Sequence, residues 1–505
     1  MAKQNIGSLY RKFVAQLREI ALLASANNIA EYDMEVFMPP AGADHRSDVM
    51  ALIAGIVHTK RTSAALWRRG EKLLAAVENG LLSETEAIIV RRTMKDLERE
   101  RKLPKRLVEE LVKTTGAAHH VWIEAREKSD FSLFLPSLQR IVELKIEEAE
   151  AVGCGGSPYD ALLGQYEPGM TAEMVEAVLS PLCDFLKVFV RRLGTGNAPK
   201  ELKIRLTAKH QARISKDLAK LIGFDFRAGR LDASAHPFTS KMHPGDVRIT
   251  TRYDESDLLS SIYSTIHETG HALYDHALPS DQFGNCAGEA ASYGIHESQS
   301  RLWENLIGRS REFSRLLAAF MTGSGEDYEL CLPDEDSFYR ALNVVKPSLI
   351  RTESDEVTYN LHVALRFEIE RGLIEGRIAA KDLPEIWNAK IREYLGVEVP
   401  SDSVGVLQDV HWSAGLFGYF PSYALGNLYS AQLLEAAVRE LPDLWLRANG
   451  EQFTWLRLWL YDKVWRHGGL LMPVEIVTQA TGAPPSADAF QRYLERKFIE
   501  IYQLK

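Results

Sequence analysis

The sequence predicts a mainly α-helical protein with one small β-sheet, and three observations support this prediction. Apolar residues recur at helical spacing from residue 5 to about residue 150, with one break at residues 38–42 (Met-Pro-Pro-Ala-Gly). Helical spacing returns between residues 355 and 376 and again from residue 425 to the end. Only residues 245–253 alternate with a period of two, which is typical of a short strand.

The helical segments are expected to pack as amphipathic elements with solvated faces. Residues 47–58 and 83–101 carry many charges on an otherwise helical pattern, so their charged faces should meet water. Residues 153–158 and 194–199 are rich in glycine and predict loops. A tryptophan-rich stretch near the end of the chain is expected to lie in the core: Trp455, Trp459 and Trp465.

The strand predicted at residues 245–253 stands directly before a helical segment. Val247, Ile249 and Thr251 alternate with Arg248, Thr250 and Arg252. As an edge strand it could pair with an extended peptide through backbone hydrogen bonds. The alternative, an ordinary structural hairpin, is equally compatible with the sequence.

Composition excludes several classes of protein. The chain has 505 residues, of which 46% are hydrophobic and 26% charged, as in globular proteins. A net charge of −9, with no basic patch interleaved with aromatic residues, argues against nucleic-acid binding. No stretch is apolar enough to predict a signal peptide or a membrane span. The four cysteines are scattered, which predicts reduced thiols and a cytoplasmic protein: Cys154, Cys183, Cys286 and Cys331.

The most informative stretch is residues 267–271, which read His-Glu-Thr-Gly-His. On a helix, residues four apart share a face, so His267 and His271 can reach a single metal ion. Asp254 or Ser256 is expected to cap this helix. Gly270 costs a mid-helix position about 1 kcal/mol relative to alanine, which indicates close packing there.

A third protein ligand is needed, because a catalytic metal site has three ligands and one open position. Residues 289–304 are predicted to form a helix, with one polar face that includes Tyr293, Ser300 and Glu297. We expect Glu297 to be the ligand, with Glu289 and Glu304 as competitors. Arg301, four residues after Glu297, could orient its carboxylate.

Such a site predicts hydrolytic chemistry. Two histidines and one glutamate leave a metal position open for a polarised water, and Glu268 can take a proton from that water as the general base. Zinc is the expected ion, and cobalt or manganese could substitute in the same ligand set.

Six dispersed motifs make the sequence resemble the carboxypeptidase Taq family of zinc-type metallocarboxypeptidases over most of its length. They occur in the family's order, at residues 236–238 (HPF), 246–250 (DVRIT), 267–271 (HETGH), 296–298 (HES), 350–355 (IRTESD) and 405–412 (GVLQDVHW). Two departures are visible. Ser354 stands where the family usually has alanine, and Tyr32 with Asp33 replaces the usual Trp-Asp pair. Neither departure involves an expected metal ligand.

The resemblance implies roles for further residues. Tyr423 and His411 are the candidates to stabilise the oxyanion of the transition state. Arg248 and Arg351 are the candidates to hold the terminal carboxylate, because a guanidinium forms bidentate bonds with carboxylates. Four more residues are expected to line the substrate pocket: His236, Asp246, Gln408 and Asp409.

The resemblance also implies an architecture and an assembly. It predicts a large bilobed all-helical metallopeptidase fold of the neurolysin/ACE type, with a small sheet beside a deep active-site groove, and a homodimer. We expect a single metallocarboxypeptidase domain over residues 1–505. Its helical N-terminal part would span about 1–200, its metal- and substrate-binding part about 201–430, and its helical C-terminal part about 431–505.

The expected substrates are peptides with a free C-terminus. The G-x-M-E-N segment of related zinc aminopeptidases, whose glutamate holds the substrate amine, is absent from the sequence. The alternatives are a zinc oligopeptidase of the endo-acting or dipeptide-releasing type and a non-enzymatic helical scaffold. Intact His267, Glu268 and His271 argue against the scaffold.

Overall fold

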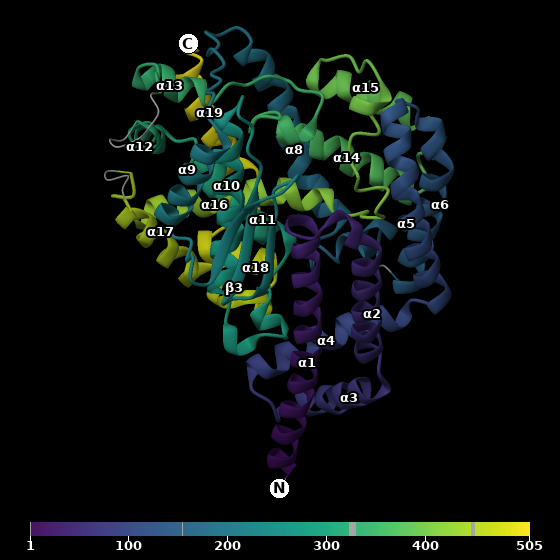
Figure 1. The fold of residues 1–505 in the computed structure, drawn as a ribbon. Coiled ribbons are helices and arrows are strands. Elements are labelled where there is room, and N and C mark those ends of the chain that lie inside the picture. Colours follow the sequence, from purple (N-terminus) through teal and green to yellow (C-terminus); the bar gives the residue numbers. More distant parts are fainter. Residues whose placement is uncertain (1, 154, 323–329, 446–449, 505) are drawn as a thin grey trace.

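The computed structural model describes residues 2–153, 155–322, 330–445 and 450–504, and helices dominate them (Figure 1). The N-terminal part consists of long helices: α1 (Ala2–Val36), α2 (Ala43–Arg61), α3 (Ala64–Glu78), α4 (Glu84–Lys102), α5 (Lys105–Lys128) and α6 (Phe131–Val152). α1 and α2 form a hairpin around a short 3-10 turn, Pro40–Gly42, at the predicted break. A reciprocal bond between Ser83 and Glu86 starts α4.

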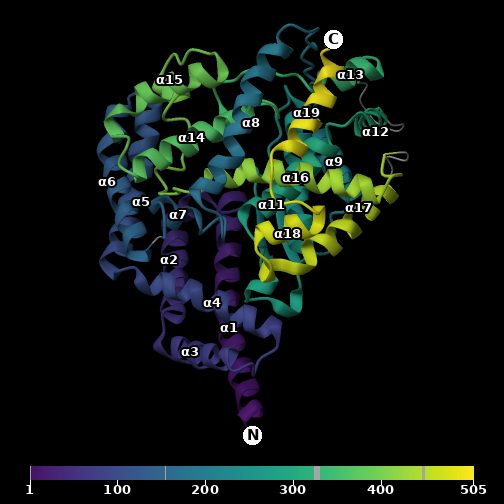
Figure 2. The same cartoon turned by 180° about the vertical axis from the view of Figure 1, so that it is seen from behind.

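The remaining helices include the two that carry the candidate metal ligands. They are α7 (Pro158–Leu163), α8 (Ala172–Leu193), α9 (Ala208–Ile222), α10 (Leu258–Ala277), α11 (Tyr293–Arg301), α12 (Arg311–Met321), α13 (Glu335–Ala341), α14 (Tyr359–Ile374), α15 (Leu383–Leu395), α16 (Phe420–Glu440), α17 (Gly450–Lys463), α18 (Pro473–Thr481) and α19 (Asp488–Ile501). Seen from behind, α16 crosses the molecule beside α11, with α18 and α19 packed against it (Figure 2). The mainly helical prediction is confirmed.

A three-stranded sheet contains the predicted strand at its centre. Its strands are β1 (Gly229–Ala233), β2 (Thr239–His243) and β3 (Asp246–Thr251), in the order β1-β3-β2. β1 runs parallel to β3, and β2 runs antiparallel to it with an irregularity near Met242. Of the two possibilities that the sequence left open, the edge strand is wrong, because both sides of β3 are paired, and the structural hairpin is confirmed by the antiparallel pair of β2 and β3.

The outer edge of β2 faces helix α1. The Ser25 hydroxyl donates a hydrogen bond to the carbonyl of Met242 at 2.8 Å, and the Asn28 amide donates one to the carbonyl of Lys241 at 3.0 Å. Side chains of α1 thus satisfy backbone groups that an edge strand leaves open.

The helix that carries His267 and the helix that carries Glu297 both begin later than predicted. Asp257, and not Asp254 or Ser256, caps α10, because its side chain accepts from the backbone N–H of Ser260. Asp254 instead accepts from Ser256 in the turn before the helix. The second helix starts at Tyr293 rather than at residue 289, with Ser292 as its cap, and continues as a π-helical segment, Leu302–Ile307.

Two further expectations on side chains are met only in part. Trp459 and Trp465 are buried, but Trp455 is 41% exposed, so it was wrongly assigned to the core. Cys183, Cys286 and Cys331 are free thiols, whereas Cys154 lies outside the described residues.

None of the helices in the described part of the chain is long and apolar enough to cross a membrane.

Gly270 lets α10 and α11 approach closely, as its place in the middle of a helix predicted. A Cβ added there would lie 2.7 Å from the Gln299 carbonyl oxygen and 2.7 Å from the Ser300 Cα. Both atoms belong to the α11 backbone, so they cannot move aside without shifting the helix.

We predict that Gly270→Ala destabilises the fold although alanine is the better helix former. Overpacking of a tight contact costs about 1–3 kcal/mol, which outweighs the intrinsic gain of about 1 kcal/mol. Urea unfolding in the presence of a chelator would measure this independently of any metal. Gly116→Ala in α5 is the matched control, because its Cβ would meet nothing within 4 Å. Equal effects of the two substitutions would contradict the packing argument.

Candidate metal centre and substrate groove

Three potential ligands converge where α10 and α11 meet. His267 and His271 lie one turn apart on α10, and Glu297 comes from α11. The Glu297 Oε2 lies 3.4 Å from His271 Nε2 and 3.8 Å from His267 Nε2. One donor atom from each of the three residues lies within 4.8 Å of the other two. Two imidazole nitrogens and one carboxylate oxygen are a donor set that fits zinc and leaves a fourth position for water.

Ion pairs behind these side chains fix their orientation. Glu304, in the π-helical segment, contacts His267 Nδ1 at 2.7 Å, on the side of the ring opposite Glu297. Arg301 donates to Glu297 at 2.6 Å and to Glu304 at 3.1 Å. Glu304 therefore supports a candidate ligand, as does the predicted Arg301. The other competitor, Glu289, pairs with Lys241 at 2.6 Å instead.

The pKa values of His271 and Glu297 suit metal binding, whereas His267 differs: burial lowers its pKa, but the charges of Glu297 and Glu304 hold that pKa above its usual value. Burial, with the neighbouring His296 adding to it, lowers the pKa of His271 to about 4, which keeps its imidazole neutral. Burial raises the pKa of Glu297, but the Arg301 charge and the imidazoles hold that pKa well below its usual value. Its carboxylate is therefore ionised at neutral pH.

Glu268 lies beside the cluster and is almost completely buried. The Thr239 hydroxyl of β2 donates to Glu268 Oε2 at 2.6 Å. No described residue donates to the other oxygen, Oε1, which leaves it available for water. Burial raises the pKa of Glu268 above its ordinary value, which is the direction that makes a carboxylate a better proton acceptor.

A second group of side chains packs against His271, and most of its members were not predicted from the sequence. His296 stacks on the His271 ring, with centroids 4.5 Å apart, and its Nε2 lies 3.2 Å from Asp275. Asp275 also lies 3.7 Å from Lys241 of β2. Asp275 follows His271 by four residues, so helical spacing alone could have identified it.

Arg351 lies in a buried network rather than in an open pocket. Its Nε and Nη2 donate to Asp409 at 3.1 and 3.0 Å, and its Nη1 donates to the Tyr359 hydroxyl at 2.9 Å. Gln408 accepts from the Arg351 backbone N–H and from Arg366, which also pairs with Asp409. Asp409 and Gln408, which were expected to line the substrate pocket, thus contact Arg351 and hold it in place.

His411 and Tyr423 form a pair next to this network. The His411 Nε2 and the Tyr423 hydroxyl are 3.1 Å apart, and the Arg351 Cζ lies 4.8 Å from the centre of the Tyr423 ring. Burial is the main cause that lowers the pKa of His411 to about 4, so this histidine is neutral at physiological pH.

Arg248 lies on the central strand β3 and is more accessible. Its Nε and Nη2 make two 2.9 Å bonds to Asp246, and its side chain is 21% exposed. Its Nη1 has no hydrogen-bond partner in the described residues. His236 is exposed, with no side-chain partner among those residues, and only its carbonyl accepts a bond, from Ser234.

The two departures from the family pattern remain compatible with this arrangement. The Tyr32 hydroxyl donates to Asp232 at 2.6 Å, and the Arg248 guanidinium lies 5.3 Å from the centre of its ring. Tyr32 thus gives Arg248 an aromatic neighbour. The Ser354 hydroxyl bonds to the carbonyl of Ile350 in the same turn and reaches no ligand.

Two buried glutamates, neither singled out in the sequence, tie the segments of the site together. Glu167 accepts from the backbone N–H of Gly294 in α11 and, at 2.7 Å, from the Ser422 hydroxyl of α16. Glu370 accepts from Trp412, Tyr159 and the Gly418 N–H. Burial raises the pKa of each carboxyl to about 7, although these donors lower it.

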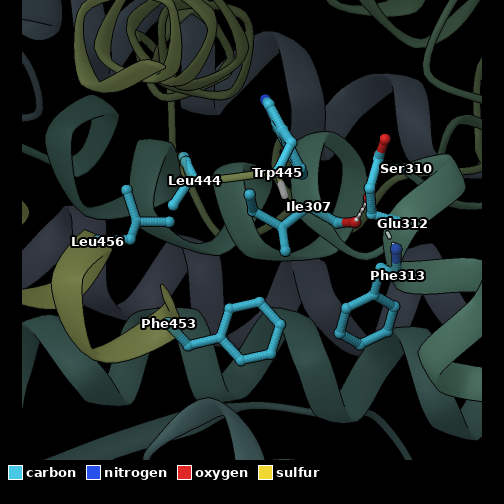
Figure 3. A pocket seen from close by; sticks show the side chains of 8 residues that line it. All are labelled: Ile307, Ser310, Glu312, Phe313, Leu444, Trp445, Phe453 and Leu456. Carbon is cyan, nitrogen blue, oxygen red and sulfur yellow. Dashed lines mark hydrogen bonds between the residues drawn. The ribbon is translucent and has the colours of Figure 1, made fainter. Parts of the chain in front are cut away.

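Two cavities lie elsewhere in the molecule. One of about 10 Å³ is an apolar gap in the core, with Phe313 and Phe453 on one side and Ile307 above them (Figure 3). Another, of about 310 Å³, is lined mainly by α1 and α2 residues and by Glu100 of α4. Neither is lined by the residues of the metal centre.

A helical fold with a His-Glu-x-x-His helix and a glutamate on the next helix is typical of metallopeptidases. Comparisons with known proteins agree. The family model of the carboxypeptidase Taq (M32) metallopeptidases matches residues 12–498, and the chain belongs to this family. It is therefore a metallocarboxypeptidase, a hydrolase that acts on peptide bonds.

Relatives match over nearly their whole length. Thermostable carboxypeptidase 1 of Thermus thermophilus is 40% identical over 98% of this chain and 99% of its own, and carboxypeptidase 1 of Bacillus subtilis is 35% identical over 98% and 99%. The crystal structure of the M32 carboxypeptidase from Deinococcus radiodurans R1 covers 98% of this chain and 100% of its own, with a TM-score of 0.92 and 34% identity. The predicted family and fold class are confirmed.

We predict that Glu167 makes the fold less stable as the pH rises. Its pKa is about 7 in the folded protein and about 4.3 in an unfolded chain. The folded state therefore binds the proton more tightly, and this contribution is complete below about pH 4.3 and lost as the pH rises through 7.

Unfolding by urea between pH 5 and 8 would test this prediction. Glu167→Gln should reduce the pH-dependent loss of unfolding free energy by up to roughly 3 kcal/mol. The exposed Glu78 offers the control Glu78→Gln, which should follow the wild-type slope. A Glu167→Gln slope as steep as that of the wild type would refute the assignment.

Proposed function

We propose that this metallocarboxypeptidase releases C-terminal residues one at a time with a divalent metal ion bound by His267, His271 and Glu297. The convergence of these three donor atoms beside Glu268 is the observation that carries the proposal. Zinc is the ion that this donor set favours, and cobalt or manganese could replace it. When bound, the metal would polarise the attacking water and the scissile carbonyl.

Glu268 acts as the general base. Its Oε1 accepts a proton from the water, while Thr239 holds Oε2 and so fixes the plane of the carboxylate. The protonated Glu268 then gives this proton to the amine that leaves when the C–N bond breaks. A raised pKa assists the first transfer, because the carboxylate is then the stronger base.

Tyr423 and His411 stabilise the developing oxyanion. A hydroxyl or imidazole donor aimed at this oxygen lowers the transition-state energy. Because the two groups are 3.1 Å apart, they share one hydrogen bond and act as a pair. Removal of one changes the orientation of the other.

Arg248 or Arg351 binds the substrate's terminal carboxylate, which makes the enzyme an exopeptidase. Each guanidinium is already oriented by an aspartate, Asp246 or Asp409, and each keeps N–H groups that this aspartate does not use. Arg248 is the more accessible, while Arg351 lies next to Tyr423. Gln408 also holds Arg351, by accepting a hydrogen bond from its backbone N–H. His236 lies exposed in the segment just before β2.

Family membership further supports a homodimer and a single domain over residues 1–505. One hydrophobic core includes residues from Ala118 to Tyr502, and a separate cluster between Phe13 and Leu97 packs the first helices. The scattered free cysteines support a cytoplasmic location.

Substitution of the two site glutamates should separate chemistry from metal binding. Glu268→Gln keeps the side-chain shape and should retain about one metal ion per chain, while kcat falls by roughly two to four orders of magnitude because the proton acceptor is lost. Glu297→Gln removes a charged ligand and should weaken the metal itself. Elemental analysis and titration with zinc, cobalt and manganese would measure binding.

His271→Ala is the reference for an emptied site in this experiment, and Glu78→Gln is the control at an exposed position. Near-normal turnover of metal-loaded Glu268→Gln would exclude the base role. Full metal occupancy in Glu297→Gln and His271→Ala would exclude the ligand set.

The carboxylate contact should appear as non-additivity between the enzyme and its substrate. Loss of a charge-assisted bidentate contact costs about 1.5–3 kcal/mol, or roughly ten- to a hundredfold in kcat/KM. Amidation of the peptide's C-terminus should cause this loss in the wild type and add little in the Arg→Ala variant of the contacting residue. Arg→Lys should recover only part of the defect, because it keeps the charge and loses the fork.

This cycle is run separately for Arg248 and Arg351, with the released residues followed by mass spectrometry. Arg227→Ala is the matched control, because Arg227 makes the same kind of pair with Asp225 on the surface, at 91% side-chain exposure. Equal cleavage of free and amidated peptides by the wild type would contradict the proposed direction.

A further inference from the structure

Four tyrosines form a continuous group of rings beside the metal centre. Tyr293 contacts Tyr166 and Tyr419 with centroid distances of 5.4 and 5.3 Å, and Tyr166 and Tyr419 are 5.1 Å apart. Tyr419 also contacts Tyr423 at 5.1 Å. All four contacts are edge-to-face, the arrangement that aromatic rings prefer. We call the first three residues, Tyr166, Tyr293 and Tyr419, the tyrosine triad.

The triad lies one helical turn from a candidate metal ligand. Tyr293 precedes Glu297 by four residues on α11, and Tyr423, which touches the triad, precedes Gly426 by three residues on α16. A Cβ added to Gly426 would lie 2.5 Å from the Glu297 Cγ, so the two helices cross at this ligand. One turn corresponds to about 5.4 Å along each axis. The rings of Tyr293 and Tyr423 therefore lie on the same side of the crossing, about one helical turn from the point where Glu297 meets Gly426.

The triad differs from other tyrosines of the protein in its exposure to solvent. Tyr159, Tyr274 and Tyr429 are fully buried, whereas Tyr293 is 50% exposed although its ring already touches two others. The hydroxyls of Tyr166 and Tyr293 have no hydrogen-bond partner in the described residues. A ring packed on one side and open on the other presents an aromatic face that a further apolar group can cover.

The position of the triad relative to Arg351 and the catalytic pair indicates what covers it. Tyr423 lies between the triad and Arg351, and His411 contacts both Tyr419 and Tyr423. A peptide whose terminal carboxylate is bound by Arg351, with its scissile bond beside Glu297 and Tyr423, would place a neighbouring side chain against these rings.

We propose that the tyrosine triad is a substrate subsite that takes an aromatic or large apolar side chain of a residue flanking the scissile bond. This inference rests on the proposed function, because it uses the metal centre to place the peptide. The subsite gives the enzyme a preference for such residues, since the added edge-to-face contacts are lost when the side chain is small or charged.

The test compares three N-blocked peptides: Ala-Ala-Ala-Phe, Ala-Ala-Phe-Ala and Ala-Ala-Ala-Ala. For each enzyme, kcat/KM on a phenylalanine peptide is divided by kcat/KM on the all-alanine peptide. Tyr293→Ala should lower this ratio about three- to tenfold, the range expected for lost aromatic contacts. The peptide whose ratio falls shows whether the terminal or the penultimate side chain occupies the triad.

Tyr293→Phe keeps the ring and should keep the ratio within about twofold of the wild-type value. Tyr461→Ala is the matched control, because Tyr461 is 46% exposed on α17 and lies outside the triad. Metal content, measured for every variant, shows whether α11 still presents Glu297.

Three outcomes would overturn the inference. Unchanged kcat/KM on all three peptides in Tyr293→Ala shows that no substrate side chain uses the ring. An equal loss on all three peptides, or a loss of metal, shows that Tyr293 only packs α11. Wild-type protein that releases no C-terminal residue contradicts the proposed function together with this inference, whereas normal release with an unchanged ratio contradicts this inference alone.

Discussion

The buried charge of Glu297 is the constraint on which the site depends. A carboxylate away from water must be paired, and here Arg301 bridges it to Glu304, which in turn contacts the rear nitrogen of His267. The same bridge therefore sets the orientation of one acid and one imidazole. It also requires α10, α11 and α16 to approach closely, which the missing side chains of Gly270 and Gly426 permit. The ion pairs of Glu297 thus form only because these three helices pack closely together.

Local periodicity explains why much of this arrangement could be predicted from the sequence. His267 and His271 share a face on any helix, and Arg301 must follow Glu297 by one turn, so these relations hold once the helices exist. The close contact at Gly270 could be inferred in the same way, because a glycine in a helix needs a compensating reason. The resemblance assigned Arg351, Gln408 and Asp409 to substrate binding, and the structure joins these three residues by hydrogen bonds.

Contacts between distant segments could not be predicted, because the sequence has no local sign of them. Thr239 meets Glu268 only because β2 packs against α10, and Glu167 reaches Gly294 across more than a hundred residues. The position of β3 in the centre of the sheet depends on β1, whose sequence alternates too weakly to be recognised as a strand. Trp455 was assigned to the core by residue type alone, although only the helix orientation decides which of its faces meets water.

The contact between α1 and β2 has a consequence for the behaviour of the protein at high concentration. An uncovered strand edge is a template on which a second chain can add its own strand and begin to aggregate. On β2 the carbonyls of Lys241 and Met242 are already occupied by Asn28 and Ser25. Helix α1 therefore covers that edge of the sheet, and removal of α1 would leave the backbone groups of β2 open to pairing with a second strand.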